Sequence, residues 1–158
     1  HSQRNTLLAV FIIAGLALSP LAISHYDDKE PAQSYRQSWF AMVATNFGPM
    51  AAMVKGEIPW QEDQMAAYAD QLAALTTLDV MRGFAEGSDK GTTRAQPEIW
   101  ENTEDFKAKM DDLDTAVDAL QIAANQGTDR KAIAAGVAAT GKACKACHDE
   151  YKSKNYLY

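Results

Sequence analysis

Apolar residues recur at intervals of three and four along four separate stretches of the chain, the spacing that places side chains on one face of an α-helix. We expect helices over about residues 32–55 and 61–78, a third from its cap Thr103 to Gly127, and a fourth that begins after its cap Thr128. The inner stripes are Phe40, Val43, Phe47, Met50 and Val54; Met65, Tyr68, Leu72, Leu75 and Leu78; Phe106, Met110, Leu113, Val117 and Leu120; and Ile133, Val137, Thr140, Cys144, Cys147, His148 and Tyr151.

Between the second and third predicted helices, about residues 83–100, the helical spacing is lost and glycine and proline punctuate the chain. This stretch is longer than the usual connection in a helical bundle, so we expect it to wrap part of a site. Four amphipathic helices with a short link between the last two predict an all-α fold, an antiparallel four-helix bundle. The methionines Met42, Met50 and Met53 are expected in its core.

Composition and charge narrow the class of protein. A chain of 158 residues with 47% apolar residues is enough for one domain with a sizeable core. Its net charge of −6 predicts an acidic surface, which excludes the basic patch that nucleic-acid binding requires.

The N-terminal stretch predicts a secretory signal peptide over residues 1–24. Arg4 precedes an apolar run, Leu7 to Leu18, which is followed by the small-residue pattern Ala22-Ile23-Ser24, and we expect cleavage before His25. The run is shorter than the roughly 20 residues that span a bilayer, although an uncleaved anchor is the alternative. The mature domain, residues 25–158, is then expected in the periplasm without stable membrane association.

Both cysteines of the chain lie in one segment, Cys144-Lys145-Ala146-Cys147-His148. The two cysteines and the histidine stand at positions i, i+3 and i+4, which share one helix face with Cβ atoms about 5–6 Å apart. The pattern C-x-x-C-H is a c-type haem attachment signal, and histidine is a standard axial ligand of haem iron. The segment predicts one covalent haem c, with thioether bonds to Cys144 and Cys147 and with His148 as the iron ligand.

Two other uses of the cysteines are less favourable. A zinc site needs about four ligands, and the only other histidines, His1 and His25, lie at the N-terminus. A thioredoxin-like dithiol belongs near a βαβ unit, and the sequence shows no strand-like alternation.

With these residues in view, the chain resembles the cytochromes c′, the class II c-type cytochromes, over about Tyr35 to Lys154. The landmarks are Tyr35-Arg36-Gln37-Ser38, Val54-Lys55-Gly56, Pro97-Glu98-Ile99-Trp100 and Cys144-Lys145-Ala146-Cys147-His148-Asp149. The resemblance implies a left-handed four-helix bundle that holds one haem, usually as a homodimer. It also implies five-coordinate, high-spin iron in an apolar distal pocket that binds nitric oxide and often carbon monoxide.

The resemblance also implies roles for five residues outside the motif. Arg36 and Gln37 match positions near the haem propionates, Phe40 matches the distal position over the iron, Trp100 is a candidate haem contact, and Lys152 matches a proximal basic residue. The alternatives are core packing for Phe40, a surface position for Arg36, loop packing for Trp100 and a solvated charge for Lys152.

The expected function is therefore a periplasmic gas-binding haem protein that handles nitric oxide. Low-spin relatives carry an iron-ligating methionine where this chain has Phe40, and electron transfer with redox partner proteins is the alternative function. An enzyme such as a peroxidase is not expected, because the distal stripe Phe40, Val43 and Phe47 offers no acid–base group.

Overall fold

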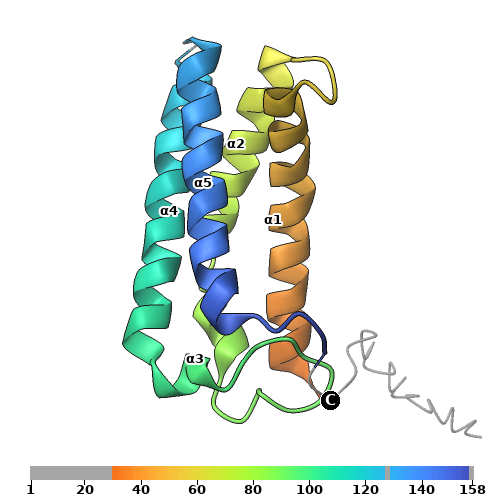
Figure 1. The fold of residues 1–158 in the computed structure, drawn as a ribbon, viewed down its shortest axis with the longest axis vertical. Coiled ribbons are helices and arrows are strands. Elements are labelled where there is room, and N and C mark those ends of the chain that lie inside the picture. Colours follow the sequence, from red (N-terminus) through yellow and green to blue (C-terminus); the bar gives the residue numbers. More distant parts are fainter. Residues whose placement is uncertain (1–29, 127–128, 157–158) are drawn as a thin grey trace, which may run out of the picture.

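The computed structural model describes residues 30–126 and 129–156. Its helices are α1 (Pro31–Lys55), α2 (Glu62–Thr76), the 3-10 helix η1 (Val80–Phe84), α3 (Glu98–Glu101), α4 (Thr103–Asn125) and α5 (Arg130–Tyr151). Figure 1 shows the four long helices running alternately up and down along one axis. The predicted all-α, antiparallel four-helix bundle is confirmed.

The four long helices form a closed ring of neighbours. Helix α1 packs against α2 and α5, and α4 packs against the same two helices from the other side. The core between them includes the fully buried side chains of Trp39, Met50, Met65, Phe106 and Leu120. In the described part of the chain, no helix is both long and apolar enough to cross a membrane.

One predicted helix end agrees with the structure, and one predicted helix cap does not. Helix α1 ends at Gly56, whose φ of 74° lies in the left-handed region that glycine adopts without strain. The prediction that Thr103 is a helix cap is wrong, because α4 begins at that residue and Asn102 occupies the N-cap position. Asp129 caps α5, and its carboxylate accepts a hydrogen bond from the Lys131 amide.

Three expectations fall outside the described residues. They are the signal peptide over residues 1–24, the helix end at Gly127 and the cap at Thr128.

The predicted inner stripe of α1 is corrected by the structure. Trp39, which lies outside that stripe, is 1% exposed, and its indole N–H donates to the Leu75 carbonyl. Phe40, Val43 and Phe47 are only half-buried. The reason is that α1 has two apolar faces, one toward the core and one toward a cavity.

Two further predicted core positions are exposed. Helix α2 ends at Thr76, so Leu78 lies beyond it and is 46% exposed. Met42 lies on the outer face of α1 and is 44% exposed, whereas Met50 and Met53 are buried as expected.

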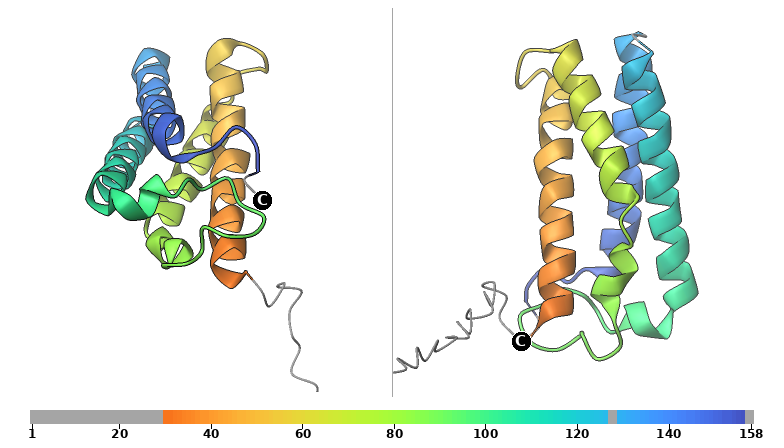
Figure 2. Two further views of the ribbon diagram at one scale, coloured as in Figure 1. Left: turned by 60° about the horizontal axis from the view of Figure 1, so that its bottom comes forward. Right: turned by 180° about the vertical axis from the view of Figure 1, so that it is seen from behind.

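The segment between α2 and α4 closes one end of the bundle. It is not irregular throughout, because η1 and α3 form near its ends. The part between these two short helices crosses the end of the bundle beside the start of α1 (Figure 2). An antiparallel backbone bridge joins its Ala95 to Lys152, directly after α5. The segment thus lies beside the start of α1 and is bonded to the chain directly after α5.

Candidate haem-binding site

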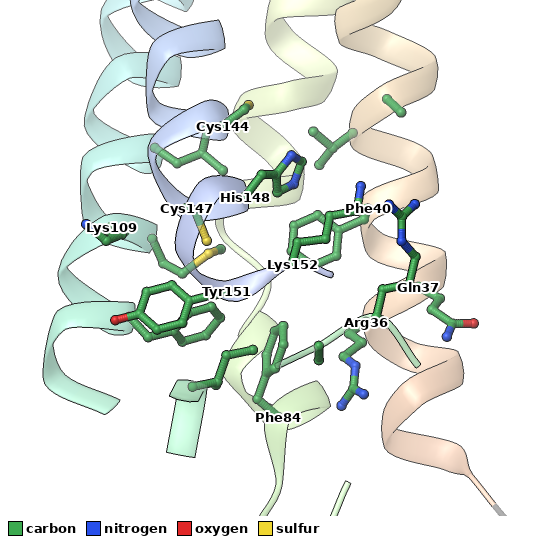
Figure 3. Close-up of a pocket in the computed structure, with 18 of the residues that line it drawn as sticks. Arg36, Gln37, Phe40, Phe84, Lys109, Cys144, Cys147, His148, Tyr151 and Lys152 are labelled. Carbon is green, nitrogen blue, oxygen red and sulfur yellow. The ribbon is translucent and has the colours of Figure 1, made fainter. Parts of the chain in front are cut away.

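A cavity of about 580 Å³ lies between α1 and α5, at the end of the bundle that this segment closes (Figure 3). Its volume is in the range of small-molecule and cofactor sites. The lining is mainly apolar. Its cationic side chains are Arg36, Arg94, Lys109 and Lys152, and no aspartate or glutamate of residues 30–126 and 129–156 lines it. The cavity therefore suits an apolar group that also carries negative charge.

Cys144, Cys147 and His148 form one wall of this cavity, called here the α5 wall (Figure 3). Ile133 and Val137, on the same helix, are buried against the rest of the bundle and fix its rotation. Both cysteines are free and half-buried. Burial raises the pKa of both thiols, that of Cys147 to about 11, so both are protonated at neutral pH.

The surroundings of His148 favour the neutral form of its imidazole, although the residue as a whole is exposed. Burial, together with the positive charges of Lys152 and Arg94, lowers the pKa of His148 below its usual value. Neutral imidazole is the form that ligates a metal. The α5 wall therefore presents two thiols and one available nitrogen ligand to the same space.

A polar network beside Cys147 ties α5 to α4. The Lys109 ammonium lies 3.4 Å from Glu150 and 3.5 Å from Asp105. The Tyr151 hydroxyl donates to the Asp105 carboxylate at 2.5 Å, and this bond raises the pKa of Tyr151 to about 12. The network holds the motif-bearing end of α5 in place, and the sequence analysis did not find it.

Phe40, Val43 and Phe47 line the opposite side of the cavity and are called here the α1 wall. None of the three side chains carries a lone pair that could ligate iron. Met42 and Met50, the methionines nearest to them in α1, do not line the cavity. The α1 wall therefore supplies bulk and apolar surface rather than a second ligand.

Arg36 lies at the edge of the cavity and is 3% exposed, so it is not an ordinary surface arginine. Its Nη1 donates to the Gly83 carbonyl and the Ser88 hydroxyl, both at 2.8 Å. Its Nη2 donates to the Ser88 carbonyl at 2.8 Å and the Thr93 hydroxyl at 2.7 Å. Four of the five guanidinium N–H groups therefore bind η1 and the segment that follows it.

Gln37, Lys152 and Trp100 occupy different places relative to the cavity. Gln37 lines it, and its side-chain amide donates to the Thr92 carbonyl at 3.0 Å. Lys152 is exposed at its edge. Trp100 does not line it: the indole N–H donates to the Phe84 carbonyl at 3.0 Å, and the ring packs behind Phe84. The structure thus brings all the expected site residues to one cavity except Trp100.

A row of aromatic rings, which the sequence patterns did not predict as part of a site, crosses the base of the cavity. Phe84 of η1 lies 6.4 Å from Phe40 and 4.8 Å from Phe106, and Phe106 lies 5.2 Å from Tyr151, measured between ring centroids. Phe106 and Tyr151 were visible as members of helical stripes. Phe84 carried no such signal, because it lies where the helical spacing has been lost.

The residues present fit a covalently bound haem. The α5 wall holds two free thiols and a neutral imidazole, the α1 wall and the aromatic row are apolar, and cations stand at the edges. The long segment after η1 contributes Thr93, Arg94 and Ala95 to the lining, as expected of a connection that wraps a site.

Known proteins resemble the chain in sequence and in fold. The sequence profile of the family described as Cytochrome C′ matches residues 32–152. A cytochrome c′ from Cereibacter sphaeroides is 37% identical over 155 residues, which is 96% of this chain and 99% of that protein. The structure of cytochrome c′ from Shewanella frigidimarina superposes with a TM-score of 0.76 at 40% identity, covering 82% of this chain and 99% of that one.

A third similar protein was solved with a ligand. It is the nitric oxide complex of a leucine-to-alanine variant of cytochrome c′ from Alcaligenes xylosoxidans. The TM-score is 0.72 at 35% identity, with 82% of this chain and 99% of that chain covered.

Proposed function

Since this chain belongs to the cytochrome c′ family, we propose that it is a c-type haem protein that binds diatomic gases, nitric oxide above all. The observation that carries the proposal is the pairing of the two cavity walls. Cys144, Cys147 and His148 face the cavity from one side, and a wall without ligand atoms faces it from the other. The solved nitric oxide complex of a relative supports the same function.

The α5 wall would hold the cofactor. The thiols of Cys144 and Cys147 would each add across a vinyl group, so that the sulfur bonds to one carbon and the proton goes to the other. His148 would be the proximal iron ligand. When bound, haem supplies an iron centre that takes a diatomic gas at an open coordination position.

The α1 wall would keep that coordination position open. Phe40 has no atom that can ligate iron, so we infer five-coordinate, high-spin iron. The half-buried phenyl ring would also occupy volume that an incoming gas needs, which makes Phe40 a steric gate. An apolar wall favours neutral diatomic molecules over water and anions.

The cations at the cavity edge would face the negative propionates. Lys152 and Arg94 line the same cavity as His148, and their charges lower its pKa. Arg36 has one N–H group left after its four bonds to η1 and the segment that follows it. We therefore propose that Arg36 mainly holds the neighbouring backbone in place beside the cavity. Lys152 would be the basic residue beside the proximal ligand His148.

The setting of the protein is part of the same proposal. We infer that residues 1–24 direct export and are removed, that the mature protein works in the periplasm as a homodimer, and that it is not an enzyme. Electron transfer is the second candidate function. It is favoured by the cations Arg94 and Lys152 in the cavity lining, which would suit an acidic redox partner.

Optical spectra of the oxidised and reduced protein, with and without nitric oxide, test this function. We expect a high-spin spectrum in both oxidation states and a new spectrum when nitric oxide is added. A low-spin spectrum with a methionine-to-iron charge-transfer band, unchanged by nitric oxide, would instead identify an electron carrier. The variant His148→Ala should keep covalent haem and lose the ferrous spectrum of the parent protein.

A further inference from the structure

The side chain of Phe84 contacts Phe40 of the α1 wall and also Phe106 at the base of the cavity. It is the last residue of η1, it is half-buried, and its ring lies in the cavity lining (Figure 3). The Phe84 ring meets the Phe40 ring nearly edge to face, with centroids 6.4 Å apart and planes at 76°. On its other side Phe40 meets Trp39 at 4.9 Å and 89°. Phe40 therefore stands between a core tryptophan and Phe84.

Phe84 is itself held from three directions. The Phe106 ring lies 4.8 Å away on the α4 side. The Trp100 indole donates to the Phe84 carbonyl and its ring packs at 6.4 Å. The Arg36 guanidinium lies 5.1 Å from the Phe84 ring centroid and donates to the carbonyl of the preceding residue, Gly83. These contacts hold both the backbone and the ring of Phe84.

The end of η1 is also pressed directly against α1. A Cβ atom on Gly83 would lie 2.7 Å from the Arg36 Cβ and 3.0 Å from the Tyr35 ring, so only glycine permits this approach. A second contact holds the start of η1, where the Tyr35 hydroxyl donates to the Asp79 carbonyl at 3.1 Å. Because η1 touches α1 this closely, a change in the position of Arg36 is transmitted to Phe84.

We propose that Phe84, held in place by Arg36, fixes the ring of Phe40 and thereby sets the affinity of the site for diatomic gases. Phe84 is then a specificity-determining residue, and Arg36 is a positioning residue that acts through it. The inference rests on the proposed function, in which Phe40 stands over the iron. Phe40 can yield to an incoming gas toward the base of the cavity only if Phe84 moves, and Phe84 is blocked by its three neighbours.

A double-mutant cycle between Phe84→Leu and Phe40→Ala tests the inference in the haem-loaded protein. The affinity and the association rate of carbon monoxide are measured on the reduced protein. We expect Phe84→Leu alone to raise the affinity by about three- to tenfold, the factor that corresponds to one aromatic pair. In the Phe40→Ala background the same change should have no effect, because there is no ring left to hold. A control cycle between Phe47→Leu and Phe40→Ala should be additive.

The results separate the inference from the function on which it rests. If Phe40→Ala leaves carbon monoxide affinity unchanged, Phe40 does not gate the iron and the proposed function loses its support from the α1 wall. If Phe40→Ala raises the affinity but Phe84→Leu acts equally in both backgrounds, the gate stands and the role of Phe84 is wrong. Urea midpoints for all four proteins show whether each is folded, and Phe84→Met replaces Phe84→Leu if that variant is not.

Arg36 is tested with a measurement that does not depend on gas binding. Arg36→Gln should raise the rate of trypsin cleavage after Arg82 by about tenfold or more, since opening of η1 is then less costly. It should also raise carbon monoxide affinity in the direction of Phe84→Leu. The control Tyr35→Phe removes the other hydrogen bond between α1 and η1. If that control raises the affinity as much as Arg36→Gln, general loosening explains the effect and the proposal is overturned.

Discussion

The α5 wall takes its three chemical groups from five consecutive residues, whereas the α1 wall depends on side chains from distant parts of the chain. Cys144, Cys147 and His148 share a helix face because of their spacing alone. Phe40 is fixed by Phe84, which η1 brings to it. The residues that would attach the cofactor are therefore set by local sequence. The residues that would set the affinity for a gas depend on tertiary packing.

The largest effect is expected on the α5 wall. Replacing both cysteines, Cys144→Ala together with Cys147→Ala, should abolish covalent haem attachment, because no other thiol exists in the chain. A haem stain after denaturing electrophoresis measures this directly. Each single variant serves as a control and should retain one thioether bond. Haem that still migrates with the double variant would contradict the assignment of the motif.

A substitution in the α1 wall should lower the stability of the protein and raise its affinity for carbon monoxide. Phe40→Ala removes a half-buried ring and should lower the free energy of unfolding by about 2–3 kcal/mol, below the range for a fully buried phenylalanine. It should also increase the affinity for carbon monoxide, because the gas no longer displaces a ring. Urea unfolding and a carbon monoxide titration measure the two effects. A loss of stability with unchanged affinity would mean that Phe40 only packs the core.

The same contrast explains how much of the site was visible in the sequence. The bundle, the end of α1 at Gly56 and the motif were predictable, because each depends on a local pattern. The burial of Trp39 in the core was not predictable. Phe40, Val43 and Phe47 are also apolar and helically spaced, so the sequence alone favoured their face as the one that meets the core. Which of two apolar faces meets the core is decided by the cavity, and the cavity exists only once α1 and α5 are placed together.

The segment after η1 shows a second limit of local patterns. Arg36 was expected near the haem propionates, and the structure instead directs four of its N–H groups to Gly83, Ser88 and Thr93. No spacing rule links a helix residue to carbonyl and hydroxyl groups some fifty positions further along the chain. Buried arginine donors must find acceptors, but the sequence does not say which acceptors are near.

A smaller effect is expected where α4 supports the α5 wall. Tyr151→Phe removes the hydrogen bond to Asp105 and should lower the free energy of unfolding by less than Phe40→Ala does, because the Asp105 carboxylate is exposed to solvent. Covalent haem should still form, because both thiols remain. Urea unfolding and the haem absorbance per mole of protein check these two statements. Tyr68→Phe, a half-buried tyrosine of α2 away from the cavity, is the matched control.

The smallest effect concerns Asp114 on α4, a position that does not line the cavity. Burial, together with the carboxylates of Asp111 and Asp118, raises the pKa of Asp114 to about 6. An unfolded aspartate has a pKa of about 3.9, so between about pH 4 and 6 the folded state binds more protons than the unfolded state. Stability from this group is therefore greatest below about pH 4 and is lost as the pH rises through 6.

Asp114→Asn should remove that pH dependence, because the amide does not titrate. The variant should be more stable than the parent protein at pH 7.5, by less than about 1 kcal/mol once solvent screening is included, and similar to it at pH 4.5. Urea unfolding at the two pH values measures the difference. Asp112→Asn, an exposed aspartate on the same helix, should leave the pH slope of the parent unchanged. An equal gain in the free energy of unfolding at both pH values would assign the effect to helix propensity rather than to the buried charge. The Asp114 carboxylate would then not destabilise α4 at neutral pH.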